Sequence, residues 1–404
     1  MRVLFDYNKV LIQKIKRKMA NNATLKYYPV GNGDTSLITL QDKTTILVDC
    51  NIRNCDNEDT YDVKKDLLKS VQYNNGIPYV DVFILTHGDQ DHCRGFKKHF
   101  YQGAPEKYSE ADKKEGLIRV DTMWFSPMIA EQHSNEDEDA YQQEAERRLA
   151  LHRKGDPKKD NPGNRIKIIG YDGNADYKDL DHLRATPGDI VTRFNDRDQS
   201  LFSIFIHAPF KEHLEALGDD KKNSTSIVFQ ARFKNSPYQE GFSTLAMFGG
   251  DSDHTSWCII LEKTKKYKNE HALYWDLFLS PHHCSWSFFN DRPQEENPIP
   301  KKTSLEVLDY KRRNAKVIAS SKKIVDDDDN PPHYEAKREY VKKVTEYNFF
   351  NTAIYNVVSR VPQPIVFEVT TQGIVNPKQS EGAAKVIGGA GLGAVNSASK
   401  YGNG

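Results

Sequence analysis

The chain of 404 residues contains few cysteines. It has five of them, Cys50, Cys55, Cys93, Cys258 and Cys284, and no two form a Cys-x-x-Cys pair. This odd number and this scattered spacing exclude a disulfide framework and a zinc-finger site. Unpaired cysteines are typical of a reducing compartment, so we expect a cytoplasmic protein.

The sequence also lacks a long apolar run. No segment approaches the roughly 20 apolar residues that a membrane-spanning helix needs, and charged residues interrupt residues 1–20, which excludes a signal peptide of the usual type. We therefore expect no membrane partner.

The sequence has no net charge either, because 57 basic residues balance 57 acidic ones. This balance excludes a globally basic nucleic-acid coat protein, although it leaves room for a local basic groove.

Three segments differ in composition. Residues 1–23 predict a basic helix, residues 24–375 a folded domain, and residues 376–404 a flexible tail rich in glycine, alanine and serine. Within the domain, residues from about 102 to 165 are charged and poor in strand-forming side chains. We interpret them as an insertion, either a lid over a site or a peripheral helix without a catalytic part.

Short runs of β-branched, aromatic and aliphatic residues recur through the domain and are separated by turn residues. The expected strands are 24–30, 36–40, 44–48, 80–86, 165–169, 201–206, 226–232, 243–248, 272–279, 316–320 and 364–370. The expected helices are 62–72, 95–101, 132–151 and 334–344. This mixture predicts an α+β fold in which two mixed β-sheets pack together and are flanked by helices.

Four side chains that bind metals follow the apolar strand 80–86 within six residues. They are His87, Asp89, Asp91 and His92. A loop at the end of a strand holds ligands close together with little freedom, as a divalent cation requires. Because the group combines imidazoles with carboxylates, it suits zinc, manganese or iron. A solvated loop is the plain alternative, but four ligand types at this spacing favour a metal site.

Further candidate ligands follow other expected strands. Asp251 comes after two glycines, His282 and His283 end an apolar run, and His207 ends another strand in the same manner. Strand ends that display ligands toward one rim are how sandwich enzymes assemble a site. For His207, the alternative is a structural histidine with a satisfied hydrogen bond.

The order of these motifs resembles a known family. The segment Thr86-His87-Gly88-Asp89-Gln90-Asp91-His92 is similar to the HxHxDH signature of metallo-β-lactamase-fold hydrolases, with aspartate for the second histidine. That variant resembles the hydrolase domain of ComEC-type DNA-uptake proteins and their soluble relatives. Further similar motifs are Gly31-Asn32-Gly33-Asp34, Ile46-Leu47-Val48-Asp49, Asn223-Ser224-Thr225-Ser226, Gly250-Asp251, Pro281-His282-His283-Cys284-Ser285 and Val317-Ile318-Ala319-Ser320 with His333.

The resemblance covers residues 24–345 and implies an αββα four-layer sandwich. It implies metal ligation by His87, Asp89, Asp91, His92, Asp251 and one of His282 or His283, with His207 as a weaker candidate. It also implies two divalent ions, zinc or manganese, and a metal-activated hydroxide. Asp251 would span both ions, Asp91 would orient the nucleophile, and Asp34 and Asp49 would support the ligands.

This chain departs from the family pattern at three places. Cys50-Asn51 stands where the family usually has Thr-Gly, Cys284 replaces a glycine, and Tyr334 replaces the proline after His333. The change at Cys284 alters the loop beside the last expected ligand. It therefore bears on which substrates the site accepts.

The function expected from the resemblance is that of a phosphodiesterase or nuclease acting on nucleic acid or a nucleotide. The alternatives are hydrolysis of another small ester, amide or thioester, and a catalytically silent binding module that keeps its metal. Arg94, Lys97 and Lys98 follow the ligand loop and are either phosphate contacts or an ordinary solvated helix face. The aromatic residues near the second histidine motif are either core or a stacking platform for a base; they are Trp275, Trp286, Phe288 and Phe289.

Overall fold

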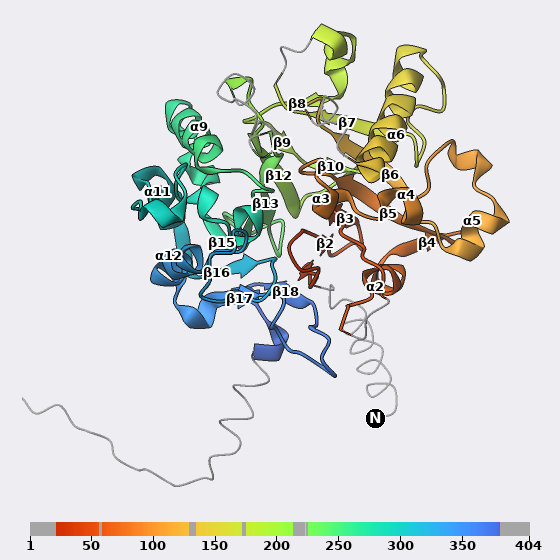
Figure 1. Cartoon of the computed structure of the whole chain (residues 1–404). Helices are drawn as coiled ribbons and strands as arrows, with labels where there is room; N and C mark the ends of the chain where they lie inside the picture. Colours follow the sequence, from red (N-terminus) through yellow and green to blue (C-terminus); the bar gives the residue numbers. More distant parts are fainter. Residues whose placement is uncertain are drawn as a thin grey trace, which may run out of the picture.

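The computed structural model describes residues 22–55, 59–128, 135–171, 175–212, 223 and 225–379. Two mixed β-sheets and their helices make up this part of the chain, so the predicted α+β class with two mixed sheets is confirmed (Figure 1). The expected helix over residues 1–23 and the expected tail over 376–404 lie almost entirely outside the described residues.

The first sheet combines strands from both ends of the described chain. Its order is β19 (Gly373–Val375), β18 (Ile365–Thr370), β1 (Thr24–Tyr27), β2 (Ser36–Thr39), β3 (Thr45–Val48), β5 (Ile77–Ile84), β6 (Arg119–Phe125), β7 (Arg165–Ile169) and β8 (Arg184–Ala185), and β4 (Gln72–Asn74) pairs with β5. Strands β19 to β3 are antiparallel, and β3 to β8 are parallel.

The second sheet is formed by the later part of the chain. Its order is β17 (Phe349–Asn351), β16 (Lys311–Ala319), β15 (Trp275–Leu279), β14 (Thr244–Phe248), β13 (Val228–Phe233), β12 (Phe202–Ala208) and β9 (Ile190–Val191). The strands from β9 to β14 are antiparallel, and those from β14 to β17 are parallel. A separate hairpin joins β10 (Arg193–Phe194) to β11 (Arg197–Asp198).

Helices cover the outer faces of both sheets, and Figure 1 shows them on opposite sides of the strands. Those on the side of the first sheet are α2 (Val63–Ser70), α3 (Gln90–Cys93), α4 (Phe96–His99), α5 (Glu110–Glu115) and α6 (Glu136–Arg153). Those on the side of the second sheet are α9 (His254–Lys266), α10 (Pro281–Cys284), α11 (Lys302–Asp309) and α12 (Tyr334–Val344). Short 3-10 helices lie at Pro105–Lys107, Ala175–Leu183, Glu270–Ala272, Trp286–Phe288, Gln294–Glu296 and Glu346–Asn348.

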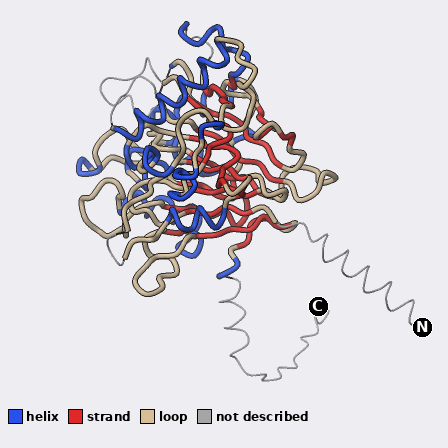
Figure 2. Tube along the Cα trace, turned by 90° about the vertical axis from the view of Figure 1, so that its right-hand side faces the viewer, coloured by secondary structure: helices blue, strands red, loops and turns tan. Residues whose placement is uncertain are grey.

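The buried apolar side chains form three clusters that follow this layering. One contains residues of both sheets, such as Ile84 and Phe248, and fills the space between them. A second lies between the first sheet and its helices, and a third between the second sheet and its helices. Figure 2 shows the strands gathered into one block. Each sheet therefore buries both faces, which explains why its strands read as continuous apolar runs.

The expectation of an insertion over residues 102–165 is wrong for much of that segment. It contains β6, which is buried along its whole length and pairs with β5 and β7. It also contains α6, whose side chains Glu144 and Arg148 are buried against the sheet rather than solvated. The charges misled the interpretation because they are paired within the fold: Arg148 Nε donates to Glu144 Oε1 at 2.7 Å.

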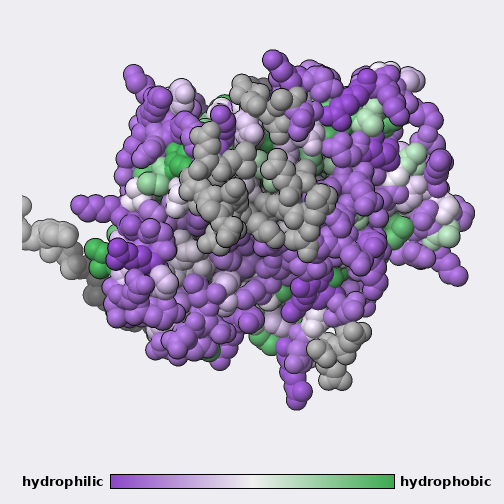
Figure 3. All heavy atoms as spheres, turned by 45° about the horizontal axis from the view of Figure 1, so that its top comes forward, coloured by the Kyte–Doolittle hydropathy of each residue, from purple (hydrophilic) through white to green (hydrophobic). Residues whose placement is uncertain are grey.

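The surface in Figure 3 is largely hydrophilic, with small and separate hydrophobic spots. Among the described residues, we find no helix with both the length and the apolar character needed to cross a bilayer.

Candidate metal centre

The candidate ligands lie in loops that follow strands of both sheets. In the first sheet, β3 and β5 are parallel, and the loop after β5 carries His87 to His92. In the second sheet, β14 and β15 are parallel, and the loops after them carry Asp251 and His283. Because the carboxyl ends of parallel strands meet at one edge of a sheet, each pair of loops lies together. The two edges face each other, and the centre forms where the sheets meet.

Four buried residues converge at this seam. Asp34, His92, Asp251 and His283 each offer a ligand atom, and these atoms all lie within 4.8 Å of one another. Asp251 Oδ1 is 2.9 Å from His92 Nε2 and 3.5 Å from His283 Nε2.

These three atoms make no well-directed hydrogen bond within the described part of the chain, although all are buried. Buried polar atoms without hydrogen bonds are rare and costly. Their convergence therefore fits a divalent cation, which imidazole nitrogen and carboxylate oxygen bind together.

Asp49 orients His92 within the cluster. Its Oδ2 atom lies 2.9 Å from His92 Nδ1, and its two oxygens accept hydrogen bonds from the Thr86 backbone N–H at 2.7 Å and the Thr86 hydroxyl at 2.6 Å. A carboxylate held in this way keeps the Nδ1 atom of the ring protonated and leaves Nε2 free for a metal. Asp49 thus has the contacts of a supporting residue.

The electrostatics of the cluster favour a positive charge at its centre. Burial opposes protonation of His92, but Asp251 and Asp49 outweigh it and hold the pKa of His92 well above its usual value. Burial is likewise outweighed at His283, where Asp251, Asp34 and Asp91 raise the pKa to about 10. The neighbouring imidazoles also hold the pKa of Asp251 well below its usual value, against the effect of burial. Carboxylates therefore dominate the electrostatic field at the centre of the cluster.

The remaining ligands expected from the motif surround this cluster. Asp91 Oδ2 lies 3.1 Å from His283 Nε2, and His282 Nε2 lies 3.8 Å from Asp251 Oδ2. His87 Nε2 is buried, makes no hydrogen bond to any described residue, and lies 3.8 Å from Asp89 Oδ2. The structure therefore brings these ligands to the same seam, and Asp251 faces histidines with both oxygens.

Asp34 was missed as a candidate ligand by the sequence reasoning, which gave it a supporting role. The loop that holds it explains its position, because Asp34 N donates to Asp91 O at 3.1 Å and Gly33 N donates to His283 Nδ1 at 3.1 Å. A side chain at Gly33 would collide with Asn51 Nδ2 and Asp91 O, and its φ is +135°. The motif Gly31-Asn32-Gly33-Asp34 was the signal that could have revealed this approach.

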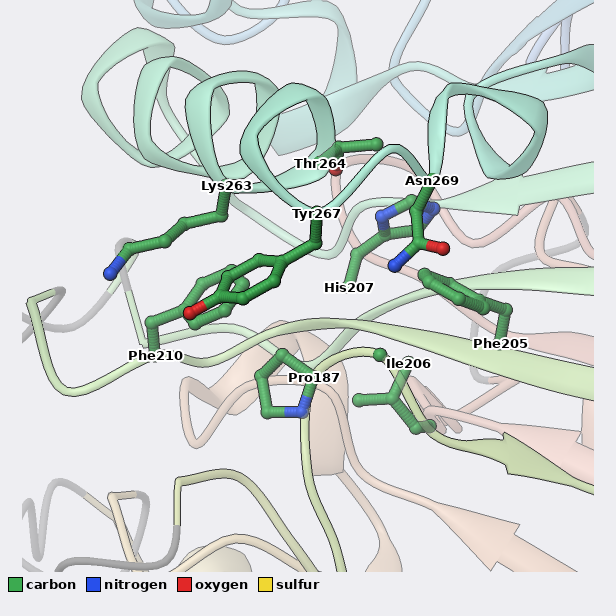
Figure 4. A pocket seen from close by; sticks show the side chains of 10 residues that line it. Pro187, Phe205, Ile206, His207, Phe210, Lys263, Thr264, Tyr267 and Asn269 are labelled. Carbon is green, nitrogen blue, oxygen red and sulfur yellow. The ribbon is translucent and has the colours of Figure 1, made fainter.

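His207 does not belong to the cluster, so its assignment as a ligand is corrected. Its Nε2 atom donates to the Ala272 carbonyl at 3.0 Å, and its ring packs on Phe205 at a centroid distance of 4.8 Å. Figure 4 shows it beside Phe205 and Asn269 in a separate pocket, which none of the clustered residues lines. The His207 side chain points outward from β12, beneath α9. His207 is therefore a structural histidine, the alternative that the sequence left open.

Two further details settle alternatives left open by the sequence. The four aromatic residues near the second histidine motif are buried in the cluster beneath α9 and α12, so they are core and not a platform for a base; they are Trp275, Trp286, Phe288 and Phe289. Cys284 has a left-handed backbone with a φ of 69°, a conformation that suits the glycine expected here from the resemblance, and His282 and His283 before it share this conformation.

Comparison with known proteins adds no family assignment. No protein-family model matches the chain, and no curated protein matches it at a significant level. The structure shows an α+β protein with two mixed sheets and a buried histidine–aspartate group that could hold a metal ion.

Proposed function

We propose that this protein is a metal-dependent hydrolase of the metallo-β-lactamase fold that cleaves phosphodiester bonds in nucleic acid or nucleotides. The single observation that carries the proposal is the buried group of Asp34, His92, Asp251 and His283. Two mixed sheets with helices on their outer faces and ligands at their shared edge agree with an αββα sandwich. The order of the motifs along the chain supports the same fold.

The residues present fit two divalent ions, which we propose to be zinc or manganese. His92, Asp251, His283 and Asp34 would hold one of them, and His87, Asp89, Asp91 and His282 surround the cluster and would complete the second. When bound, such ions lower the pKa of water and neutralise charge on the phosphate oxygens.

The protein's own groups position the reactants. Asp49 fixes the ring of His92, and Asp91 combines a buried contact to His283 with a side chain that is 30% exposed. Asp91 is therefore placed to accept a hydrogen bond from a water molecule at the mouth of the site and to orient it toward a substrate.

The carboxylate content of the site favours the phosphodiester over other substrates. Asp34, Asp89, Asp91 and Asp251 make it harder than an imidazole-rich site, and hard sites suit manganese as well as zinc. Phosphoryl transfer needs charge stabilisation on both the attacking and the leaving oxygen, which paired cations supply together.

The test is metal analysis of the purified protein together with a hydrolysis screen. DNA, RNA and bis(4-nitrophenyl) phosphate are offered beside a β-lactam and a thioester, each with zinc and with manganese. We expect bound metal and phosphodiester cleavage. Robust hydrolysis of the β-lactam or thioester without phosphodiester cleavage would reject the proposal in favour of another hydrolase. Bound metal without any hydrolysis would favour a binding module.

A further inference from the structure

A groove lined mainly by basic residues, with Glu136 and Asp137 on one side, lies next to the loop that carries the candidate ligands. It is formed by the loop Ile52–Asn54, by the segment Arg94–His99 with α4, and by the first residues of α6, and it has a volume of about 510 Å³. Sites for small molecules and nucleotides usually have volumes of about 300–1,000 Å³. The groove is therefore large enough for part of a substrate.

Backbone hydrogen bonds tie the groove to the ligand loop. Cys50 N donates to His92 O at 2.7 Å, and Ile52 N donates to Arg94 O at 2.9 Å. The two loops thus run side by side from the metal centre outward. Arg53 follows Ile52 in one loop, and Arg94 comes two residues after the ligand His92 in the other. The two arginines are the first cations beyond the centre along this path.

The cations of the groove differ in their partners. Lys97 Nζ lies 2.8 Å from Glu136 Oε2, and Lys98 Nζ donates to Asn54 Oδ1 at 3.3 Å. Arg53 and Arg94 are partly buried, and neither guanidinium group makes an ion pair or a hydrogen bond within the described part of the chain. The two lysines are therefore engaged, whereas the two guanidinium groups retain all their donors.

The guanidinium group of Arg53 packs closely against the backbone at Gly31 although it has no described hydrogen-bond partner. Gly31 lies against its guanidinium, and a Cβ atom on Gly31 would be only 3.1 Å from Arg53 Nη1. Burial, and then the charge of Arg94, lower the pKa of Arg53, so the two guanidiniums repel each other. Two repelling, partly buried cations are unfavourable by themselves, and an anion between them removes this cost. The guanidinium fork matches phosphate oxygens in particular.

We propose that Arg53 and Arg94 bind a backbone phosphate of a polynucleotide, next to the phosphodiester at the metal centre. This inference rests on the proposed phosphodiesterase function and narrows its substrate class. A mononucleotide or a simple phosphodiester offers no second backbone phosphate to the groove, whereas a nucleic-acid strand does. The contact is with the backbone, so it carries no preference for base sequence.

The test measures binding by the full-length protein as purified. A fluorescent single-stranded DNA with a phosphorothioate backbone, which resists hydrolysis, is titrated against wild type, Arg53→Gln and Arg94→Gln. We expect each variant to bind on the order of tenfold more weakly, with the slope of log Kd against log salt reduced by about 0.7. Arg193→Gln is the matched control. It removes the same charge from an arginine paired with Asp196 and Asp198, and its Kd should stay that of wild type.

Binding and cleavage together separate the two proposals. No binding by wild type, or equal binding by wild type and by both arginine variants, overturns the inference. Hydrolysis of DNA and bis(4-nitrophenyl) phosphate by the same preparations tests the proposed function on its own. Weakened binding in the two variants with no cleavage by wild type would uphold the groove and reject the phosphodiesterase. Arg53→Lys and Arg94→Lys, which keep the charge, should recover part of the lost affinity and show that the loss is not one of folding.

Discussion

At the scale of single residues, the contacts of the ring nitrogens separate the candidate metal-binding histidines from a structural histidine. Nδ1 of His92 lies 2.9 Å from Asp49 Oδ2, Nδ1 of His283 lies 3.1 Å from Gly33 N, and both Nε2 atoms face Asp251. His207 uses its Nε2 atom for a backbone carbonyl instead. From the sequence all three were expected as ligands after a strand, and only the surrounding structure separates the two candidate ligands from the structural histidine.

Asp251 is the residue whose loss should matter most. Asp251→Ala removes the carboxylate that faces His92 and His283 with one oxygen and His282 with the other. We expect phosphodiesterase activity and metal content to fall at least about a hundredfold, while the circular dichroism spectrum stays that of wild type. Asp253→Asn is the control, because the side chain of Asp253 caps α9 and its asparagine can still accept from Ser256 N. A folded Asp251→Ala protein with normal turnover would exclude Asp251 from the mechanism.

His207 should make folding stability depend on pH. Burial lowers its pKa to about 3, below the value of about 6.5 in an unfolded chain. The unfolded state therefore binds the proton first, and stability that is complete above about pH 6.5 is lost as the pH falls toward about 3. The loss should reach about 2 kcal/mol by about pH 5. Urea unfolding of wild type and His207→Gln between about pH 7 and pH 5 measures it, and identical pH slopes would contradict this origin.

At the scale of elements, α6 shows how a charged helix can belong to a core. Arg148 is fully buried, and its guanidinium donates to Glu144 and to the carbonyls of Arg165 and Val120. Glu144 also accepts from Arg147 and from Gly103 N. The helix therefore docks on β6 and β7 through satisfied polar groups as well as apolar contacts, and its charges are poor indicators of exposure.

Removing Glu144 should destabilise the protein strongly. Glu144→Ala leaves the buried Arg148 without its counter-ion, which costs about 3–5 kcal/mol of unfolding free energy. Glu146→Ala on the same helix is the control. Glu146 pairs with Arg153 at 3.4 Å and its side chain is 48% exposed, so its loss should cost below about 1 kcal/mol. Urea denaturation compares the two variants, and equal midpoints would show that the buried pair contributes no more than the exposed one.

Most strands and the ligand loop could be predicted from the sequence, because a buried strand is a continuous apolar run and four ligands lie within six residues. β6 was missed because Arg119 and Asp121 interrupt its apolar pattern, and these charges neutralise each other at 2.6 Å. Asp34 was missed as a candidate ligand because its approach to His283 depends on how the two sheets pack. No local pattern contains that information.

At the scale of the whole molecule, the candidate metal centre joins the two sheets. His87, Asp89, Asp91 and His92 follow a strand of the first sheet, whereas Asp251, His282 and His283 follow strands of the second. Further hydrogen bonds cross the same seam, such as Ser320 Oγ to Gly33 O at 2.6 Å. An ion bound here contacts both halves of the fold at once, so metal binding and sheet packing should be thermodynamically linked.

Metal removal should therefore lower the stability of the entire protein. A free ion at 100 times its Kd adds about 2.7 kcal/mol if it binds only the folded state. Thermal unfolding with EDTA, with zinc and with manganese should show a higher Tm in the presence of the metal. Asp251→Ala should abolish this difference. A Tm that is the same with EDTA and with metal would argue against a site between the sheets.

The pairing of β1 with β18 has a consequence for how the protein is made. Thr24 lies opposite Glu368, so strands from the two ends of the described chain are neighbours in one sheet. While the ribosome is still producing the second sheet, β1 has β2 on one side and an open edge on the other. An unpaired strand edge is a template for pairing with other chains, and long-range pairing is slow. Aggregation during synthesis should therefore be most acute just before the final strands emerge, and a chain that ends before Ile365 would retain that open edge permanently.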